Sequence, residues 1–212
     1  MLEYKHFLII IFSRELFFRK KLTPKKPTPS VNKCVFSHLS HKFSKWFACL
    51  AILVAGCSIN VPEQVKPVSG FEISPYLGTW YEIARLNHSF EEGLDHVTAE
   101  YSLRPDGGIK VINRGFNAEE GEWDEAEGKA YFVESPEVAH LKVSFFGPFY
   151  ASYIVFYLDE DYETALISGP DHSYFWILSR HKTLSEDELN SLVLKAKAAG
   201  FDTEKLIYVD QS

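Results

Sequence analysis

The residue types that usually carry catalysis or bind metals are scattered in this chain rather than clustered. The histidines beyond the N-terminal region are His88, His96, His140, His172 and His181, and they lack the paired spacing typical of metal ligands. The sequence contains no Gly-x-Ser-x-Gly elbow, phosphate loop or dinucleotide fingerprint. The carboxylate pairs Glu91-Glu92 and Glu119-Glu120 are typical of solvated turns. We therefore predict no catalytic residue, no metal site and no cofactor.

One cysteine stands in a pattern with a specific chemistry, which is acylation. Leu53-Val54-Ala55-Gly56-Cys57 resembles the lipobox of bacterial lipoproteins, in which the cysteine is acylated and becomes the new N-terminus. Basic residues and an apolar run over residues 46–56 precede it, as in a secretory signal. The alternative is an ordinary signal peptide in which Cys57 stands by chance. Ser58 after an acylated cysteine favours sorting to the outer membrane.

These features divide the chain into three parts. Residues 1–56 are interpreted as the signal segment, residues 57–70 as the lipidated cysteine and a tether, and residues 71–212 as the folded domain. A signal usually has about 15–30 residues. We therefore interpret residues 1–34 as an over-extended start, with Val35 as an initiation point that gives a signal of ordinary length.

The charge is divided in the same way. Residues 1–56 carry ten Lys+Arg and two Asp+Glu, a net of +8, whereas residues 57–212 carry twelve and twenty-seven, a net of −15. An acidic domain repels a phosphate backbone, so nucleic acid is excluded as a partner. The cysteines Cys34, Cys49 and Cys57 all precede the domain, which therefore has no internal disulfide.

The domain consists of short strand-like runs separated by turn residues. The eight runs are residues 80–86, 97–103, 109–116, 127–133, 139–145, 150–158, 164–168 and 174–180. Short links predict an up-and-down antiparallel meander, which loses its exposed edges when it closes. One helix is predicted after the strands, because Ser185 and Glu188 form a capping box before an apolar stripe and Gly200 can end it. Residues 206–209 follow as a closing segment.

Three motifs in order give the domain a specific resemblance. Gly78-x-Trp80 opens the first run, Asp161-Tyr162 lies in a late turn, and Arg180 closes the last run. Together with the wording GTWYEIARLNHSF and ISGPDHSYFWILSR, they resemble the lipocalin family, in particular the bacterial outer-membrane lipocalins, over roughly residues 71–210. The resemblance implies an all-β fold, an eight-stranded up-and-down antiparallel barrel with one C-terminal α-helix.

The same resemblance assigns roles to the motif residues. It makes Gly78, Trp80, Asp161, Tyr162 and Arg180 structural, with the guanidinium of Arg180 stacked on Trp80 at the closed end. It places the long link over residues 87–96 as a lid on the open end. One lipocalin branch uses a cavity thiol for catalysis, and the lack of any cysteine after residue 57 excludes that chemistry here.

An eight-stranded barrel has room for side chains or for one small ligand. On the last strand Tyr174, Trp176 and Arg180 share a face by alternation, so an inward Arg180 predicts that Tyr174 and Trp176 also point inward. The candidate ligand contacts are Tyr101, Asn113, Tyr131, Tyr150, Tyr174 and Trp176, and the alternative for each is ordinary packing. The aromatic stretch over residues 145–150 either shapes the cavity mouth or forms an apolar patch for a partner or membrane.

These observations favour a lipid-binding lipocalin that stores or transports fatty acids or lysophospholipids in the bacterial cell envelope. It is expected on the outer membrane, lipid-anchored and facing the periplasm, and a homodimer is left open. Two alternatives remain. One is an envelope interaction protein with a filled cavity, and the other is an enzyme acting on a bound lipid, for which the sequence offers no acid–base pair.

Overall fold

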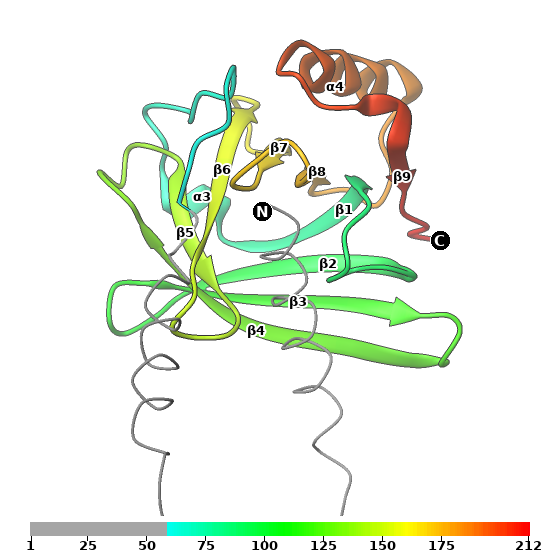
Figure 1. Cartoon of the computed structure of the whole chain (residues 1–212), viewed down its shortest axis with the longest axis horizontal. Coiled ribbons are helices and arrows are strands. Elements are labelled where there is room, and N and C mark those ends of the chain that lie inside the picture. Colours follow the sequence, from blue (N-terminus) through cyan, green and yellow to red (C-terminus); the bar gives the residue numbers. More distant parts are fainter. Residues whose placement is uncertain (1–58) are drawn as a thin grey trace, which may run out of the picture. The chain divides into compact units, whose positions relative to one another are not determined.

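The computed structural model describes residues 59–212, whose strands form one antiparallel sheet that closes on itself (Figure 1). The strands are β1 (Gly78–Leu86), β2 (Leu94–Leu103), β3 (Ile109–Asn117), β4 (Glu122–Phe132), β5 (His140–Ser144), β6 (Ala151–Leu158), β7 (Thr164–Ser168), β8 (Phe175–Ser179) and β9 (Leu206–Tyr208). The helices are α3 (Ile73–Tyr76), α4 (Glu186–Ala198) and η3 (Thr203–Lys205). Within residues 59–212, no helix has the length and apolar character needed to cross a membrane.

The strand order confirms the predicted barrel. Each strand from β2 to β8 pairs with the strand that precedes it in the sequence, and β1 also pairs with β8, which closes the ring of eight strands. β9 is an additional short strand that pairs antiparallel with β1 where β1 and β2 diverge. The chain end continues between them, since Gln211 donates its side-chain amide to the carbonyls of Glu82 and Val97, both at 2.8 Å. The closing segment predicted from the sequence therefore seals a seam of the barrel.

Two apolar cores lie on the two sides of the barrel wall. The inner core contains at least one buried residue from each of the eight strands, among them Trp80, Tyr101, Val111, Ala130, Leu141, Val155, Ile167 and Leu178. The outer core packs α4 against β1, β6, β7 and β8 through residues that include Leu192 and Ala196 (Figure 1). The helix begins where the sequence predicts, because Ser185 and Glu188 form the reciprocal capping box.

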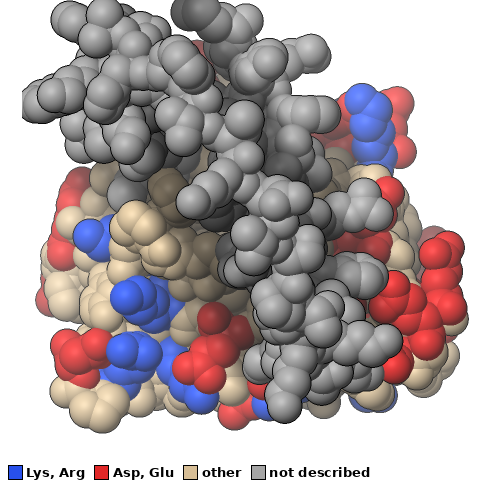
Figure 2. Space-filling view, turned by 60° about the horizontal axis from the view of Figure 1, so that its bottom comes forward, with Lys and Arg blue, Asp and Glu red and all other residues tan. Residues whose placement is uncertain are grey.

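Two strands extend further than predicted, because charged side chains on the outer face mask them in the sequence. β4 begins at Glu122 rather than at Glu127, and β2 begins at Leu94 rather than at Val97, which shortens the lid link to residues 87–93. Arg114 on β3 bridges to Glu100 at 3.0 Å and to Glu125 at 2.8 Å. Figure 2 shows Lys and Arg side chains interspersed with Asp and Glu on the exposed wall.

The closed end of the barrel is built around Arg180 and Trp80. The guanidinium carbon of Arg180 lies 4.0 Å from the centre of the Trp80 ring system, and Trp80 is fully buried. The same guanidinium donates to the carbonyls of Thr79, Pro75 and Leu77 at 2.7, 2.7 and 2.9 Å. This geometry matches the structural contact implied by the resemblance, and it joins β8 to the segment that enters β1.

Two unusual backbone positions serve this closed end. Gly78 has φ +94°, a conformation that favours glycine, whereas a Cβ placed there would make only an ordinary contact, 3.5 Å from Nη1 of Arg180. Tyr162 also has a positive φ of 59°, and its carbonyl accepts from Nε of Arg180 at 3.4 Å. The turn between β6 and β7 is fastened by Asp159, which accepts from the backbone N–H of Glu163 and Thr164, whereas Asp161 is exposed.

The segment before the barrel, predicted as a tether, packs onto the wall in its described part. Pro62 and Val65 are buried, and the N–H of Val68 donates to the carbonyl of Val155 at 2.9 Å. Ser69 forms an antiparallel bridge with Val138. The polar, proline-containing sequence does not indicate that this segment packs on the barrel, because the contacts of Val68 and Ser69 are made by the backbone.

Candidate functional site

An irregularity in β1 brings a carboxylate and a guanidinium together inside the barrel. The pairing of β1 with β8 shifts register between Glu82 and Ala84, so that Glu82 lies opposite Leu178 and Arg85 opposite Trp176. Such a bulge puts two residues that are three apart on the same face. Nη1 of Arg85 donates to Oε1 of Glu82 at 2.8 Å, and both side chains are almost fully buried. The barrel interior therefore contains a buried ion pair.

The second amino group of Arg85 holds the lid. Nη2 donates to the carbonyl of Glu91 at 2.7 Å and to the carbonyl of Leu94 at 3.0 Å. The carbonyl of Glu91 belongs to the link between β1 and β2, and that of Leu94 belongs to the first residue of β2. Arg85 thus fixes the lid backbone from inside, and its Nε has no hydrogen-bond partner within the described residues.

The lid closes on an aromatic cluster at the mouth of the barrel. Oε2 of Glu91 accepts from the indole N–H of Trp176 at 3.0 Å and lies 3.2 Å from Nε2 of His88. The His88 ring lies 5.0 Å from Trp176 and 5.8 Å from Tyr174, measured between centroids. Phe90, 48% exposed, covers the outer side of this cluster at 6.4 Å from Tyr174.

Burial and neighbouring charges shift the pKa values of Glu82 and Glu91 in opposite directions. Burial raises the pKa of Glu82 well above its ordinary value, and the negative charge of Glu91 raises it further, against the lowering effect of Arg85. Burial also acts to raise the pKa of Glu91, but the contacts with His88, Trp176 and Arg85 outweigh it and leave the pKa lowered. The pKa of Glu91, which holds the lid, therefore lies below that of Glu82.

Three tyrosine hydroxyls form a second polar group deeper in the barrel. Oη of Tyr153 lies 2.6 Å from Oη of Tyr76 and 2.8 Å from Oη of Tyr101. Burial raises the pKa of each of the three, so they are neutral hydroxyls at physiological pH. Three hydroxyls joined by two hydrogen bonds leave one O–H hydrogen for a further acceptor.

Four of the six predicted ligand contacts lie on the inner side of the barrel or at its mouth. Tyr101 belongs to the inner core, and Asn113 lies opposite Ala99 on the inner face with its buried Oδ1 unpartnered within residues 59–212. Tyr174 and Trp176 belong to the cluster under the lid, with ring centroids 6.3 Å apart. Their placement agrees with the prediction that they face the cavity, and their contact with a ligand stays a prediction.

The other two predicted contacts lie on the outer wall, which corrects the sequence-based placement. Tyr131 sits between the inward residues Ala130 and Phe132, and its hydroxyl donates to Asp106 at 3.0 Å. Tyr150 has its ring 6.4 Å from that of Tyr131, beneath Nζ of Lys142. Tyr131 lies one residue out of phase with the inner face, and composition alone does not tell the phase of a strand.

Sequence reasoning missed the buried polar residues Glu82, Arg85, His88 and Glu91, and with them Tyr76 and Tyr153. Glu91 was predicted in a solvated turn, yet it is 8% exposed. Glu82 and Arg85 were hidden because regular alternation places residues three apart on opposite faces. A charged residue at each of two positions in an otherwise apolar strand was the available signal.

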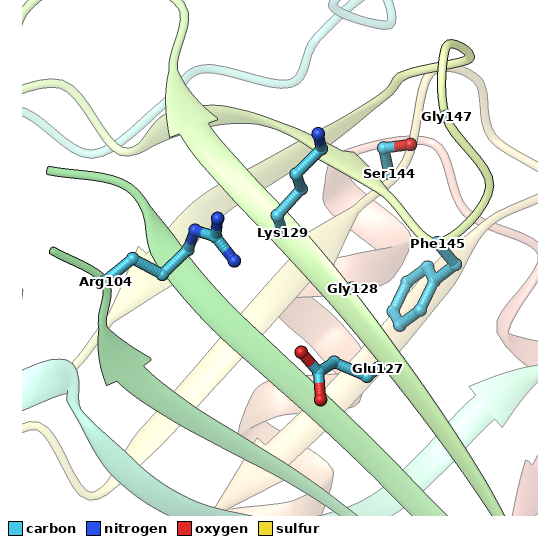
Figure 3. A pocket seen from close by; sticks show the side chains of 7 residues that line it. All are labelled: Arg104, Glu127, Gly128, Lys129, Ser144, Phe145 and Gly147. Carbon is cyan, nitrogen blue, oxygen red and sulfur yellow. The ribbon is translucent and has the colours of Figure 1, made fainter. Parts of the chain in front are cut away.

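A surface pocket of about 160 Å³ lies beside the end of the pairing between β4 and β5. Figure 3 shows its lining: Arg104, Glu127, Gly128, Lys129, Ser144, Phe145 and Gly147. Lys129 and Ser144 form the last pair between the two strands on this side, and Oγ of Ser144 is buried without a partner in the described residues. A Cβ on Gly128 would lie 2.8 Å from Phe145, so the missing side chain makes room for this ring.

A second pocket, of about 360 Å³, lies beside the C-terminal seam and is lined by Tyr81, His96, Thr98, Trp123, Lys182, Gln211 and Ser212. Among residues 59–212, no group of three or more His, Cys, Asp or Glu side chains is placed to hold a metal ion. The chemistry of the site is therefore that of an apolar interior with a few buried hydrogen-bonding groups and a cover held by hydrogen bonds.

The family model of the lipocalin-like domain matches residues 71–211, which is most of the chain and the whole barrel. The protein belongs to the lipocalin family. The outer membrane lipoprotein Blc of Vibrio cholerae is 57% identical to this lipocalin over 162 residues, which cover 76% of this chain and 94% of the relative. The protein of the same name from Escherichia coli K12 is 52% identical over 165 residues, covering 77% and 93%. These relatives confirm the resemblance to bacterial lipoprotein lipocalins.

Solved structures show the same fold for this lipocalin at lower identity. Insecticyanin from Manduca sexta, the tobacco hornworm, superimposes with a TM-score of 0.58 at 24% identity, covering 72% of this chain and 87% of that chain. The cockroach allergen Per a 4 gives a TM-score of 0.55 at 20% identity, with 69% and 92% covered.

Proposed function

We propose that this lipocalin binds one fatty acid or lysophospholipid in its barrel and stores or transports it in the bacterial cell envelope. The observation that carries the proposal is the combination of a mostly apolar barrel interior with buried, unpartnered polar atoms and a lid. Ligand sites of this class are mostly apolar with a small number of orienting polar groups. An acyl chain supplies about 0.8 kcal/mol per buried CH₂, which supports micromolar binding or tighter for a chain of ordinary length.

The polar atoms support an amphiphile rather than a plain hydrocarbon. Nε of Arg85 is a donor and Oδ1 of Asn113 an acceptor, both buried without a partner within residues 59–212. The tyrosine group of Tyr76, Tyr101 and Tyr153 offers a further O–H hydrogen. A carboxylate or phosphate ester on the ligand accepts from such donors, and an unpaired buried group gains most from such a bond.

Entry and release would require the lid to part from the wall. The contacts to break are those of Glu91 with Trp176 and of Arg85 with the lid carbonyls. Each is a charge-assisted hydrogen bond of modest net strength, so these contacts hold the lid closed but still allow it to open. The proposed function is thus carriage with a gated mouth, and we propose binding rather than catalysis.

We further propose that Cys57 carries the lipid anchor and that the barrel resides on the outer membrane, facing the periplasm. Two relatives that align over more than nine-tenths of their length are named outer membrane lipoproteins. The sequence before Cys57 has the lipobox pattern, and it lies outside the described residues.

The test is a titration of delipidated protein with a lysophospholipid below its micelle concentration, followed by tryptophan emission. Saturable binding with a one-to-one endpoint supports the proposal. A filled cavity gives no saturable signal, which would favour an envelope interaction protein instead. Native mass spectrometry of protein extracted from its own membrane identifies the bound lipid, detects any lipid-cleavage product that an enzyme would leave, and reads whether a homodimer is present.

A further inference from the structure

The segment that precedes the barrel runs along β6 toward the loop between β5 and β6. Val68 bonds to Val155, and eight residues earlier the carbonyl of Asn60 accepts from Oγ of Ser152 at 2.7 Å. Ser152 is the second residue of β6, and His140 Nε2 lies 3.2 Å from the same hydroxyl. The chain therefore leaves the described structure close to the start of β6.

This position limits how far an acylated cysteine can lie from the wall. Cys57 lies two positions before Ile59, and an extended chain spans at most about 7 Å over that length. The acyl group at Cys57 would thus emerge beside the β5–β6 loop, rather than at the end of a long tether. The membrane that holds the acyl group would lie against the same part of the barrel.

Exposed apolar side chains gather along this route. Ile59 is 39% exposed and Val61 is 41% exposed, and they flank the bonded Asn60. Phe146 at 39% and Phe149 at 48% are exposed on the loop that leads into Ser152. Four large apolar side chains close to a lipid attachment point fit the interfacial layer of a bilayer better than they fit water.

The charges beside the loop are positive although the domain as a whole is acidic. Lys142 pairs with Ser152 across the strands and lies over the Tyr150 ring at 5.5 Å, and Lys129 lies on the same outer face. On this wall Glu127 is bridged by Lys110 at 3.0 Å and Asp106 by Arg104 at 2.9 Å. Lys129 and Lys142 take part in no ion pair among residues 59–212, so they are available to anionic lipid headgroups.

We propose that Ile59, Val61, Lys142, Phe146 and Phe149 form a bilayer-contact surface that seats the barrel on the membrane to which Cys57 is attached. The inference rests on the anchoring at Cys57 proposed above and adds a fixed orientation to it. The diacylglycerol at Cys57 holds the protein on the bilayer, and a second apolar and basic contact fixes which side of the barrel faces the bilayer. The pocket between β4 and β5, lined by Lys129, Phe145 and Gly147, lies at the base of this loop and therefore faces the membrane side.

The test uses the mature, acylated protein with a single reporter. The chain has no cysteine after Cys57, so Phe149→Cys introduces the one free thiol for an environment-sensitive dye. The control is Leu194→Cys on α4, at a side chain that is 67% exposed. Both proteins are reconstituted on vesicles of phosphatidylethanolamine and phosphatidylglycerol that carry a nitroxide quencher within the acyl region.

We expect several-fold stronger quenching and a blue-shifted emission for the dye at position 149 than for the dye at position 194. Lys142→Glu should weaken the quenching at position 149 and reduce its dependence on phosphatidylglycerol, whereas Lys197→Glu on α4 should not. Equal quenching at 149 and 194 on vesicle-bound protein overturns the contact surface and leaves the anchor intact. Protein that does not float with the vesicles overturns the anchor and the contact surface together, while lysophospholipid binding in solution tests the carrier function separately.

Discussion

The indole N–H of Trp176 on the barrel wall donates to Oε2 of Glu91 on the lid at 3.0 Å, and this bond joins the cover of the barrel to its rim. The same oxygen lies 3.2 Å from Nε2 of His88. Because these contacts favour the charged carboxylate, the pKa of Glu91 is lowered despite its burial. The mouth is thus closed by a charge that the surrounding groups stabilise, and its strength should depend on pH.

Glu91→Gln should lower the free energy of unfolding at pH 7 by about 1–3 kcal/mol, because the charged acceptor is lost. A lowered folded-state pKa contributes stability above the unfolded value of about 4.3 and loses it as the pH falls through the folded-state pKa. The gap between wild type and variant should therefore close below about pH 4. Urea unfolding from pH 3 to pH 8 measures this, with the exposed neighbour in Glu92→Gln as the control. A gap that is constant with pH would contradict the assignment.

Arg85→Met should be among the most destabilising single changes in the barrel. It leaves Glu82 buried without its partner and frees the carbonyls of Glu91 and Leu94, and breaking a buried pair costs about 3–5 kcal/mol. Adding Glu82→Gln should recover part of this loss, because the uncompensated charge is removed. Arg114→Met, which breaks exposed pairs, should cost less than about 1 kcal/mol. A double-mutant cycle without coupling would show that the pair does not act as a unit.

Arg180→Ala should cost about 1–3 kcal/mol in unfolding free energy, because the cation–π contact with Trp80 is lost and a gap remains at the closed end. Arg180→Lys keeps the charge but cannot serve the three carbonyls of Thr79, Pro75 and Leu77 together, so it should recover only part of the loss. Lysophospholipid affinity should change less than stability. A variant with an unchanged denaturant midpoint would show that Arg180 does not seal the barrel.

The sequence predicts the antiparallel meander and the capped helix, because alternation, turn residues and a capping box indicate them directly. The closed eight-stranded barrel and the contact of Arg180 with Trp80 are implied by the family resemblance that the ordered motifs carry. It does not predict the interior polar network. The register shift after Glu82 reverses the alternation within β1, and no residue type announces that shift. The sequence also does not predict that Tyr131 and Tyr150 lie on the outer wall, since aromatic side chains suit both faces of a strand. Buried Glu91 follows from the lid's tertiary contacts, which local sequence does not encode.

The anchor can be tested by Cys57→Ala. The variant should remain unacylated and keep its leader, because the lipoprotein signal peptidase acts at the lipid-modified cysteine. Mass spectrometry of the purified protein and partition into detergent measure both effects. Ser58→Asp is the companion change, and it should alter sorting between membranes while leaving acylation in place. A Cys57→Ala protein that still carries diacylglycerol would contradict the lipobox interpretation.

The last prediction concerns Trp176, whose indole N–H donates to the lid residue Glu91. Trp176→Ala should lower lysophospholipid affinity by about 1–3 kcal/mol, because it removes apolar surface from the site. Trp176→Phe should lose less affinity, since it keeps an aromatic ring and removes only part of the apolar surface together with the donor to Glu91. Affinity is read by a radiolabelled ligand at denaturant-free conditions where circular dichroism shows the variants folded. Equal affinities for all three proteins would remove Trp176 from the binding site.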